Sequence, residues 1–412
     1  MAVLIHTLSN GLRVVLYPFS GIESIFVTLA LRGGFRFESV ENVGISHLTE
    51  HLILTNPNTE SILEGIGGNL DGEVGGEQIV CKVFFPVRRF AEGLRLFTEV
   101  LQADVGESGF KREQAVIAEE GLAFLDDTDY IAATLLEKAL WGEGLDSSVE
   151  NVLKPPDLNL VQFREFRQRI SVGTNMVLAV VGRFKPRTAL NLVDQYFGGF
   201  PRGKLLSWKR CLPMQSLQPQ VVKKELPLRQ VHCRLGFVVP RVGVREELVQ
   251  GLLEAYLGNG AITTGLLFER LRIEAGLVYC AGVGAAACRY GDYFVVFWDC
   301  LPNKVETILE MVLKELRLLV EEKAPLERFE RAKRVFAHRL RGTTDEPETL
   351  SEYFASGLLS RGRVSTQERR AKQVMTITRG EVQRFAQTYL RLECAVFALV
   401  GPVADLSPRI IP

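Results

Sequence analysis

The spacing of apolar and polar positions along the chain predicts strands and helices in alternating groups. Short apolar runs rich in β-branched residues and bounded by glycine or proline are typical of strands. The predicted strands are residues 12–17, 25–31, 78–85, 177–181, 231–238, 293–298 and 395–400. Stretches with apolar residues three or four apart predict amphipathic helices. The predicted helices are residues 44–54, 61–66, 88–101, 111–125, 246–257, 266–274, 305–321, 326–341 and 379–390.

The order of these elements repeats once along the chain. Each half runs strand, strand, helix, helix, strand, helices, strand over about 200 residues, which indicates an internal duplication of one unit. We therefore expect an α+β protein with two homologous α/β-roll halves, in which helices pack on mostly antiparallel sheets. The polar stretch around Pro213 and Pro219 is the best linker candidate. The expected division is residues 1–212, a linker at 213–222, and residues 223–412.

Composition narrows the classes of function that the chain can have. Of the 412 residues, 47% are hydrophobic and 24% charged, enough for large buried cores. Lysine plus arginine and aspartate plus glutamate both total 49, and this balance argues against a nucleic-acid partner. The seven cysteines show no C-x-x-C spacing, which favours a reducing compartment. Without a basic leader or an apolar run long enough to span a bilayer, we expect a cytoplasmic protein with no membrane partner.

One predicted helix carries a motif with metal-binding spacing. His47 and His51 are four residues apart and therefore lie one turn apart on the same helix face. Two imidazoles in that arrangement can hold one tetrahedral Zn²⁺, and Glu50 between them can accept a proton from an activated water. The alternative is a helix with two ordinary histidines and a surface glutamate. Since the chain has only five histidines, a chance match to H-x-x-E-H is rare.

A catalytic zinc usually has three protein ligands, so a further ligand is expected elsewhere in the chain. The other histidines share no local pattern with acids, which favours a carboxylate. Within the predicted helix 111–125, Glu113 and Glu120 are seven residues apart and share one face, whereas Glu119 points elsewhere. Two aligned acids on a helix can equally form a solvated face, and the spacing alone does not decide between these readings.

Taken together, the motifs resemble those of a known enzyme family. Gly44-x-x-His47-x-x-Glu50-His51, then Gly67-Gly68, then Glu113-x-x-Val116-Ile117-x-x-Glu120 resembles the pitrilysin/insulinase-like inverzincin zinc metallopeptidases. The nearest subgroup looks like the mitochondrial processing peptidase β-subunit and its bacterial relatives. The resemblance implies that Glu120 completes the zinc site and that Glu113 supports it from behind, as an orienting partner would.

A further match to this family lies in the second half of the chain. The segment from Leu271 to Tyr279 resembles the family's Arg…Gly-Leu-x-Tyr segment, which would assign Arg272 and Tyr279 to contacts with the bound peptide or the developing oxyanion. A fixed cation and a neutral hydroxyl donor both suit a carbonyl that gains negative charge. Taken alone, the two residues would be an ordinary arginine at a helix end and a half-buried tyrosine.

The resemblance implies a zinc-dependent endopeptidase that cuts peptides or unfolded segments inside a closed chamber. We expect a homodimer, or a heterodimer with a related chain, because each chain has only two halves. A peptide is expected to extend the sheet at the strand 78–85. Thr49, Asp71-Gly72 and Cys81 depart from the family's usual residues, which bears on substrate preference and activity. The alternative function is a non-catalytic peptide-binding or assembly subunit of the same fold.

Overall fold

The computed structural model describes residues 3–54, 57–141, 158–207, 218–240, 242–259, 265–287 and 292–409. The chain forms two compact units. Unit 1 comprises Met1–Glu119, Lys154–Lys209 and Gly342–Gln367, and unit 2 comprises Glu120–Leu153, Arg210–Arg341 and Glu368–Pro412. Each unit thus includes a segment from the other half of the sequence. Residues 213–217 of the predicted linker lie outside the described ranges, and Gln220 begins a strand.

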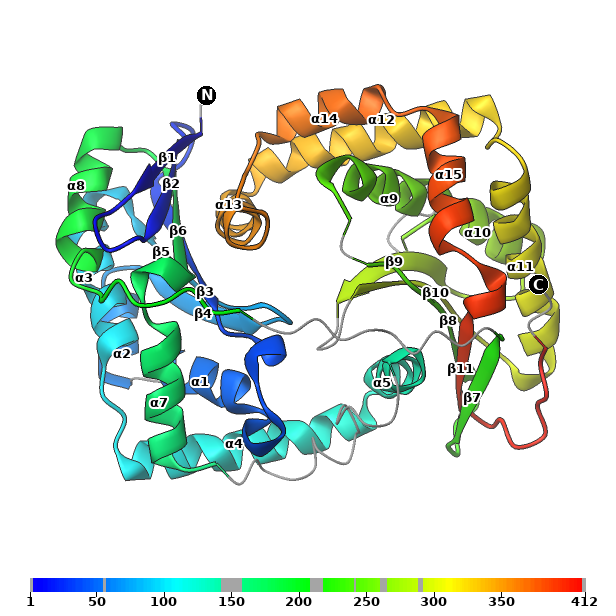
Figure 1. Ribbon diagram of the computed structural model, residues 1–412, viewed down its shortest axis with the longest axis horizontal. Helices are drawn as coiled ribbons and strands as arrows, with labels where there is room; N and C mark the ends of the chain where they lie inside the picture. Colours follow the sequence, from blue (N-terminus) through cyan, green and yellow to red (C-terminus); the bar gives the residue numbers. More distant parts are fainter. Residues whose placement is uncertain are drawn as a thin grey trace. The chain divides into compact units, whose positions relative to one another are not determined.

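Unit 1 is built on a six-stranded sheet with the strand order β1-β2-β6-β3-β5-β4 (Figure 1). Its strands are β1 (Leu4–Thr7), β2 (Arg13–Pro18), β3 (Ser24–Arg32), β4 (Asn69–Val74), β5 (Gln78–Pro86) and β6 (Met176–Gly182). Only β2 and β6 pair in parallel, and the other neighbours are antiparallel. Every residue of β6 is buried, as expected for an apolar strand covered on both faces.

Helices cover both faces of the sheet in unit 1. They are α1 (Ile45–Leu54), α2 (Pro57–Gly65), α3 (Phe90–Gln102), the first part of α4 (Glu107–Asp126), α7 (Leu160–Ile170), α8 (Pro186–Phe197) and α13 (Pro347–Arg361). On one face, apolar residues of α1, α3 and α8 form the larger core. The other face packs on α13, whose Phe354 and Leu358 contact Tyr17 and its neighbours. A buried hydrogen bond of 2.6 Å joins Ser351 of α13 to Thr28 of β3.

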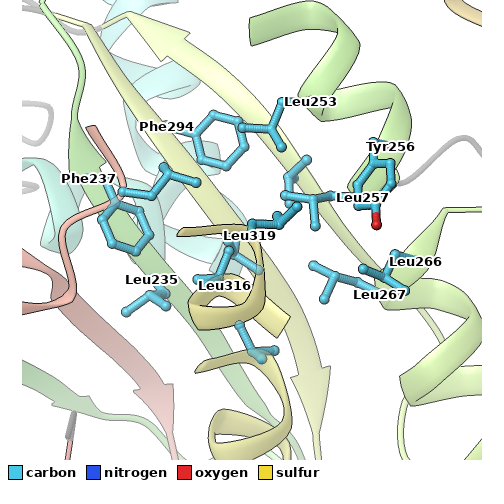
Figure 2. Packing of buried hydrophobic residues seen from close by; sticks show 14 of the residues in the cluster. Leu235, Phe237, Leu253, Tyr256, Leu257, Leu266, Leu267, Phe294, Leu316 and Leu319 are labelled. Carbon is cyan, nitrogen blue, oxygen red and sulfur yellow. The ribbon is translucent and has the colours of Figure 1, made fainter. Parts of the chain in front are cut away.

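Unit 2 is built on a five-stranded sheet with the strand order β7-β11-β8-β10-β9. Its strands are β7 (Gln220–Glu225), β8 (Val231–Val238), β9 (Ala281–Ala287), β10 (Asp292–Cys300) and β11 (Val396–Gly401). Its helices are α5 (Thr128–Trp141), α9 (Val244–Leu257), α10 (Leu266–Phe268), α11 (Val305–Glu321), α12 (Leu326–Gly342), α14 (Gln367–Met375) and α15 (Arg379–Tyr389). In the main core, Phe237 and Phe294 of the sheet meet Leu253 of α9 and Leu316 of α11 (Figure 2).

The two sheets share one plan. The order β2-β6-β3-β5-β4 in unit 1 corresponds to β7-β11-β8-β10-β9 in unit 2, and in each sheet the first pair is parallel while the rest are antiparallel. A second helix covers the remaining face of each sheet, α13 in unit 1 and α5 in unit 2. The predicted fold class, α+β with two similar halves and mostly antiparallel sheets, is confirmed.

Two expectations from the sequence are wrong in detail. Residues 78–85 were expected to form a sheet edge, but they belong to β5, which pairs with β3 on one side and β4 on the other. The edge strand is β4, whose polar sequence gives little apolar signal. The helix expected at 266–274 is a three-residue α-helical turn followed by a π-helix, η5 (Glu269–Glu274). Among the helices in the described ranges, none has the length and apolar content needed to cross a membrane.

Candidate metal centre

Helix α1 presents the H-x-x-E-H motif in unit 1. Its apolar residues Ile45, Leu48 and Leu52 are buried against the core of the unit, so the helix is held firmly on the sheet. The start of the helix is fixed by Glu38, whose carboxylate accepts hydrogen bonds of 3.0 Å from the backbone N–H groups of Gly44 and Ser46. A negative charge at a helix N-terminus also interacts favourably with the helix dipole.

The two histidines are arranged as ligands of one metal ion would be. Their Nε2 atoms lie 3.2 Å apart, and their rings cross at 81° with centroids separated by 4.7 Å. Two nitrogens bound to a tetrahedral zinc at the usual bond length are separated by about 3.3–3.4 Å. The observed spacing therefore fits a shared zinc with little adjustment of the side chains.

The carboxylate of Glu50 lies beside this pair. Its Oε2 is 3.8 Å from Nε2 of His51, and one ligand-type atom from each of His47, Glu50 and His51 lies within 4.8 Å of the others. Glu50 is largely buried, with 8% of its surface exposed. A buried carboxylate so close to a metal position is suited to accept a proton from a water molecule there.

Strand β4 approaches Glu50 closely because residue 72 is a glycine. A Cβ atom at Gly72 would lie 3.0 Å from Glu50 Oε1 and 2.5 Å from Leu54 Cδ1, so a larger residue would displace one of them. Opposite Gly72 on β5 is Cys81. Burial, followed by the charges of Glu50 and Asp71, raises the pKa of the Cys81 thiol well above its ordinary value. Cys81 therefore packs here as a small neutral side chain.

Glu113 of α4 lies behind the histidine pair. Its Oε2 is 3.5 Å from Nδ1 of His51, on the opposite side of the ring from the nitrogen that faces His47. Only 3% of its surface is exposed, and its second oxygen accepts a 3.0 Å hydrogen bond from Nε of Arg112. An acid in this position can hold the tautomer in which Nε2 is free to bind a metal.

The other predicted site residues lie in unit 2. Glu120 is half-buried on α4, two turns beyond Glu113, where the division between the units falls. Its assignment as the third ligand stays a prediction. Arg272 lies on the π-helix η5, and Tyr279 is 83% exposed just before β9. Their assignment to substrate contacts also stays a prediction.

Sequence reasoning did not identify Glu38, and it noted Gly72 only as a departure from the family pattern, without its contact with Glu50. Glu38 acts through backbone groups six and eight residues away, and Gly72 acts through the packing of a strand on a helix. Neither gives a local spacing signal comparable with that of the histidines. Thr49, the departure within the motif, is fully buried, and among the described residues its hydroxyl has no hydrogen-bond partner.

Comparison with known proteins agrees with the motif. Residues 157–336 match the family model described as the Peptidase M16 inactive domain. This match begins after α4 and does not include the H-x-x-E-H motif. An uncharacterized zinc protease of Rickettsia bellii is 20% identical over 97% of both chains. The mitochondrial-processing peptidase subunit beta of Dictyostelium discoideum is 22% identical over 97% of this chain and 89% of its own.

Solved structures show the same fold. A protease from Helicobacter pylori superimposes with a TM-score of 0.85 at 17% identity, covering 97% of this chain and 99% of the other. A Pseudomonas fluorescens structure described as a peptidase M16 inactive domain gives a TM-score of 0.84 at 18% identity, covering 99% and 100% of the two chains. The resemblance inferred from the motifs is thus confirmed: the chain is similar to M16 peptidases, to proteins described as zinc proteases and to the mitochondrial processing peptidase β-subunit.

Proposed function

We propose that the protein is a zinc-dependent endopeptidase. The observation that carries this proposal is the arrangement on α1, in which two imidazole nitrogens lie 3.2 Å apart with the Glu50 carboxylate beside them. His47 and His51 would hold the ion, together with Glu120 as the third ligand. When bound, the ion would supply a Lewis acid and lower the pKa of a water molecule to about 7.

Within this proposal the protein side chains have separate tasks. Glu50 accepts a proton from the attacking water and returns it to the leaving amine. Glu113 holds the His51 ring in place through Nδ1. Arg272 and Tyr279 would stabilise the negative charge that develops on the carbonyl oxygen.

The edge strand β4 supports an extended peptide as the substrate. An edge strand can add a further strand through main-chain hydrogen bonds, which gives affinity with loose sequence preference. Gly72 lies on β4 next to Glu50, so a peptide paired with β4 would pass directly beside the proposed base. Unfolded segments would be cut in preference to folded domains, because only extended chains can pair in this way.

The proposed assembly rests on the family resemblance, and the proposed location rests on scattered cysteines that favour a reducing compartment. We propose a homodimer or a heterodimer with a related chain, and a cytoplasmic location. The second candidate function is a non-catalytic subunit that binds peptides. It is favoured by the description of the matching family model as an inactive domain, although that match covers only residues 157–336.

Glu50→Gln tests the proposed function directly. The amide keeps the size of the side chain but cannot accept a proton, so we expect zinc to stay bound while peptide cleavage falls at least about a hundredfold. Zinc content and the hydrolysis of a mixed pool of unstructured peptides are measured on the same preparation. Glu64→Gln, an exposed glutamate on α2, is the matched control. Cleavage at the wild-type rate by the Glu50 variant would rule out this base, and a wild-type protein with zinc but no cleavage would favour the peptide-binding subunit.

A further inference from the structure

A second group of metal-binding side-chain types lies in unit 2, apart from the motif on α1. His232 is on β8, Asp299 is on β10, and Asp129 is near the start of α5. One ligand-type atom from each of the three lies within 4.8 Å of the others. Among the described residues, this group and the one on α1 are the two that meet that condition.

Strand pairing fixes two of the three residues in place. Asp299 and His232 are directly opposite each other in the antiparallel pair of β10 and β8, so their side chains leave the sheet on the same face. Helix α5 packs on this part of the sheet and contributes Asp129. The three side chains therefore converge from three different elements, as is common in metal sites that stabilise a fold.

The distances suit one shared ion. Nδ1 of His232 is 3.0 Å from Asp299 Oδ1 and 3.8 Å from Asp129 Oδ1. Nitrogen and oxygen ligands of a tetrahedral zinc are separated by about 3.3–3.5 Å, and the two observed distances lie on either side of that value. Little side-chain movement would bring all three atoms into contact with one ion.

Two of these atoms are buried polar atoms whose hydrogen-bonding capacity is not satisfied within the described part of the chain. Nδ1 of His232 and Oδ1 of Asp299 are fully buried and 3.0 Å apart, and among the described residues neither atom meets the geometry of a hydrogen bond. Burial alone would raise the pKa of the Asp299 carboxyl, but its contacts with His232 and Arg234 nevertheless lower that pKa, so the carboxylate form is favoured. A buried polar atom without a partner destabilises the folded state. An ion bound by both atoms would satisfy them together.

Arg234 is the cation already present beside the group. It pairs with Asp129, and its Nη1 lies 3.6 Å from Asp299 Oδ1. One guanidinium against two carboxylates leaves a net negative charge when His232 is neutral, so a further cation is favoured electrostatically. Each carboxylate has two oxygens, and an acid that ligates a metal is commonly oriented by a second partner. Because Arg234 contacts Oδ1 of both carboxylates, an ion bound there requires a small shift of the guanidinium or the use of the second carboxylate oxygen.

We propose that His232, Asp299 and Asp129 bind a divalent transition-metal ion of the zinc type. An imidazole ligand favours such ions over calcium and magnesium, which prefer oxygen ligands alone. The ion fastens the start of α5 to β8 and β10. Its role is to stabilise unit 2, and it is independent of peptide cleavage.

The test uses the full chain with His47→Ala and His51→Ala, which removes the histidine pair on α1. After metal is stripped and Zn²⁺ is returned by equilibrium dialysis, we expect about one equivalent to remain bound. Adding His232→Ala is expected to weaken that binding at least about tenfold. Zn²⁺ is also expected to raise the melting temperature of the parent variant, and to do so less after the His232 substitution.

Controls keep this result distinct from a folding defect. His338→Ala removes an exposed histidine on α12 and is expected to leave binding unchanged. Asp299→Asn keeps the size of the side chain and is expected to weaken binding as His232→Ala does. Circular dichroism of each variant checks that it is folded. The proposal is overturned if the parent variant retains no zinc, or if it retains the same amount after His232 and Asp299 are each replaced.

Discussion

Single side chains around the histidine pair contribute separately to the proposed zinc binding, and each contribution can be tested by one substitution. Glu113 is the clearest case, because it is almost fully buried and contacts only the far nitrogen of the His51 ring within the motif. It does not need to touch the metal to affect binding. Its effect would act through the orientation and tautomer of the ligand.

Glu113→Gln is therefore expected to weaken zinc binding about 10- to 100-fold, with a smaller effect on peptide cleavage at saturating zinc. The amide can still contact Nδ1, but it cannot hold the ring with a negative charge. Zinc affinity is measured by competition with a chelator of known strength. Glu107→Gln, on the exposed first turn of α4, is the control. An affinity equal to that of the wild type would show that Glu113 has no orienting role.

The residues of the motif could be predicted from the sequence because their geometry is local. The spacing of His47 and His51 on a helix fixes their separation whatever surrounds them. Gly72 could not be predicted in the same way, since its importance depends on how closely β4 approaches α1. Glu38 likewise acts across a loop, and nothing in its own neighbourhood of the sequence marks it as a cap.

In each unit a helix packs on the edge strand of the sheet, but the contacts between helix and strand differ between the two units. In unit 1, α1 packs on β4 and places Glu50 beside Gly72. In unit 2, α9 packs on β9, and Glu254 of that helix accepts a hydrogen bond from the backbone of Ala285. Nearby, the N–H of Val283 donates to the carbonyl of Gly258. The edge strand of unit 2 is thus partly capped by its own helix, which limits pairing with another chain.

The position of α1 depends on the cap at its start. Glu38→Ala removes two hydrogen bonds to backbone N–H groups and a favourable charge at the helix N-terminus. We expect a loss of about 1–2 kcal/mol in the free energy of unfolding, and weaker zinc binding because α1 carries both histidines. Urea unfolding and chelator competition measure the two effects. Glu41→Ala, an exposed residue of the same loop, should change neither. An unchanged unfolding free energy in the Glu38 variant would contradict the cap.

Some elements could not be assigned from the sequence for a physical reason. Strand β4 has the sequence NLDGEV and alternates between exposed and half-buried positions, so its apolar signal is weak. Helices α5 and α13 were not among the predicted helices, because their amphipathic patterns are weak. Their partners are sheets formed mainly by the other half of the chain. Local sequence periodicity carries no information about long-range packing of this kind.

For the whole molecule, this exchange of helices makes each half of the sequence depend on the other. Without α13, the face of the unit 1 sheet that carries Val15, Ala30 and Val177 would be exposed to water. Without α5, the corresponding face of unit 2, which carries Tyr293 and Val396, would lose its cover. Burial of apolar surface contributes about 25 cal/mol per Å², so each covering helix stabilises the sheet on which it packs.

The same arrangement predicts how stability changes with pH. Glu137 lies on α5 where the helix meets the sheet, and Tyr293 donates a 2.9 Å hydrogen bond to it. Burial raises the pKa of Glu137 to about 7, and burial likewise raises the pKa of Glu254 to about 7. In the unfolded chain both carboxyls titrate near the ordinary value of about 4.3. The folded state therefore binds these protons more tightly than the unfolded state does.

This difference in proton binding sets the direction in which stability changes with pH. Stability from the protonated carboxyls is fully present below about pH 4 and is lost as the pH rises to about 7, at up to about 3 kcal/mol for each group. Glu137→Gln keeps a neutral side chain beside Tyr293 at every pH. We expect the variant to lose less unfolding free energy than the wild type between pH 5 and pH 7.5, as followed by urea unfolding and tryptophan fluorescence. Glu306→Gln, an exposed residue on α11, should retain the wild-type slope. A Glu137 variant with that same slope would show that α5 does not depend on a protonated carboxyl to stay on its sheet.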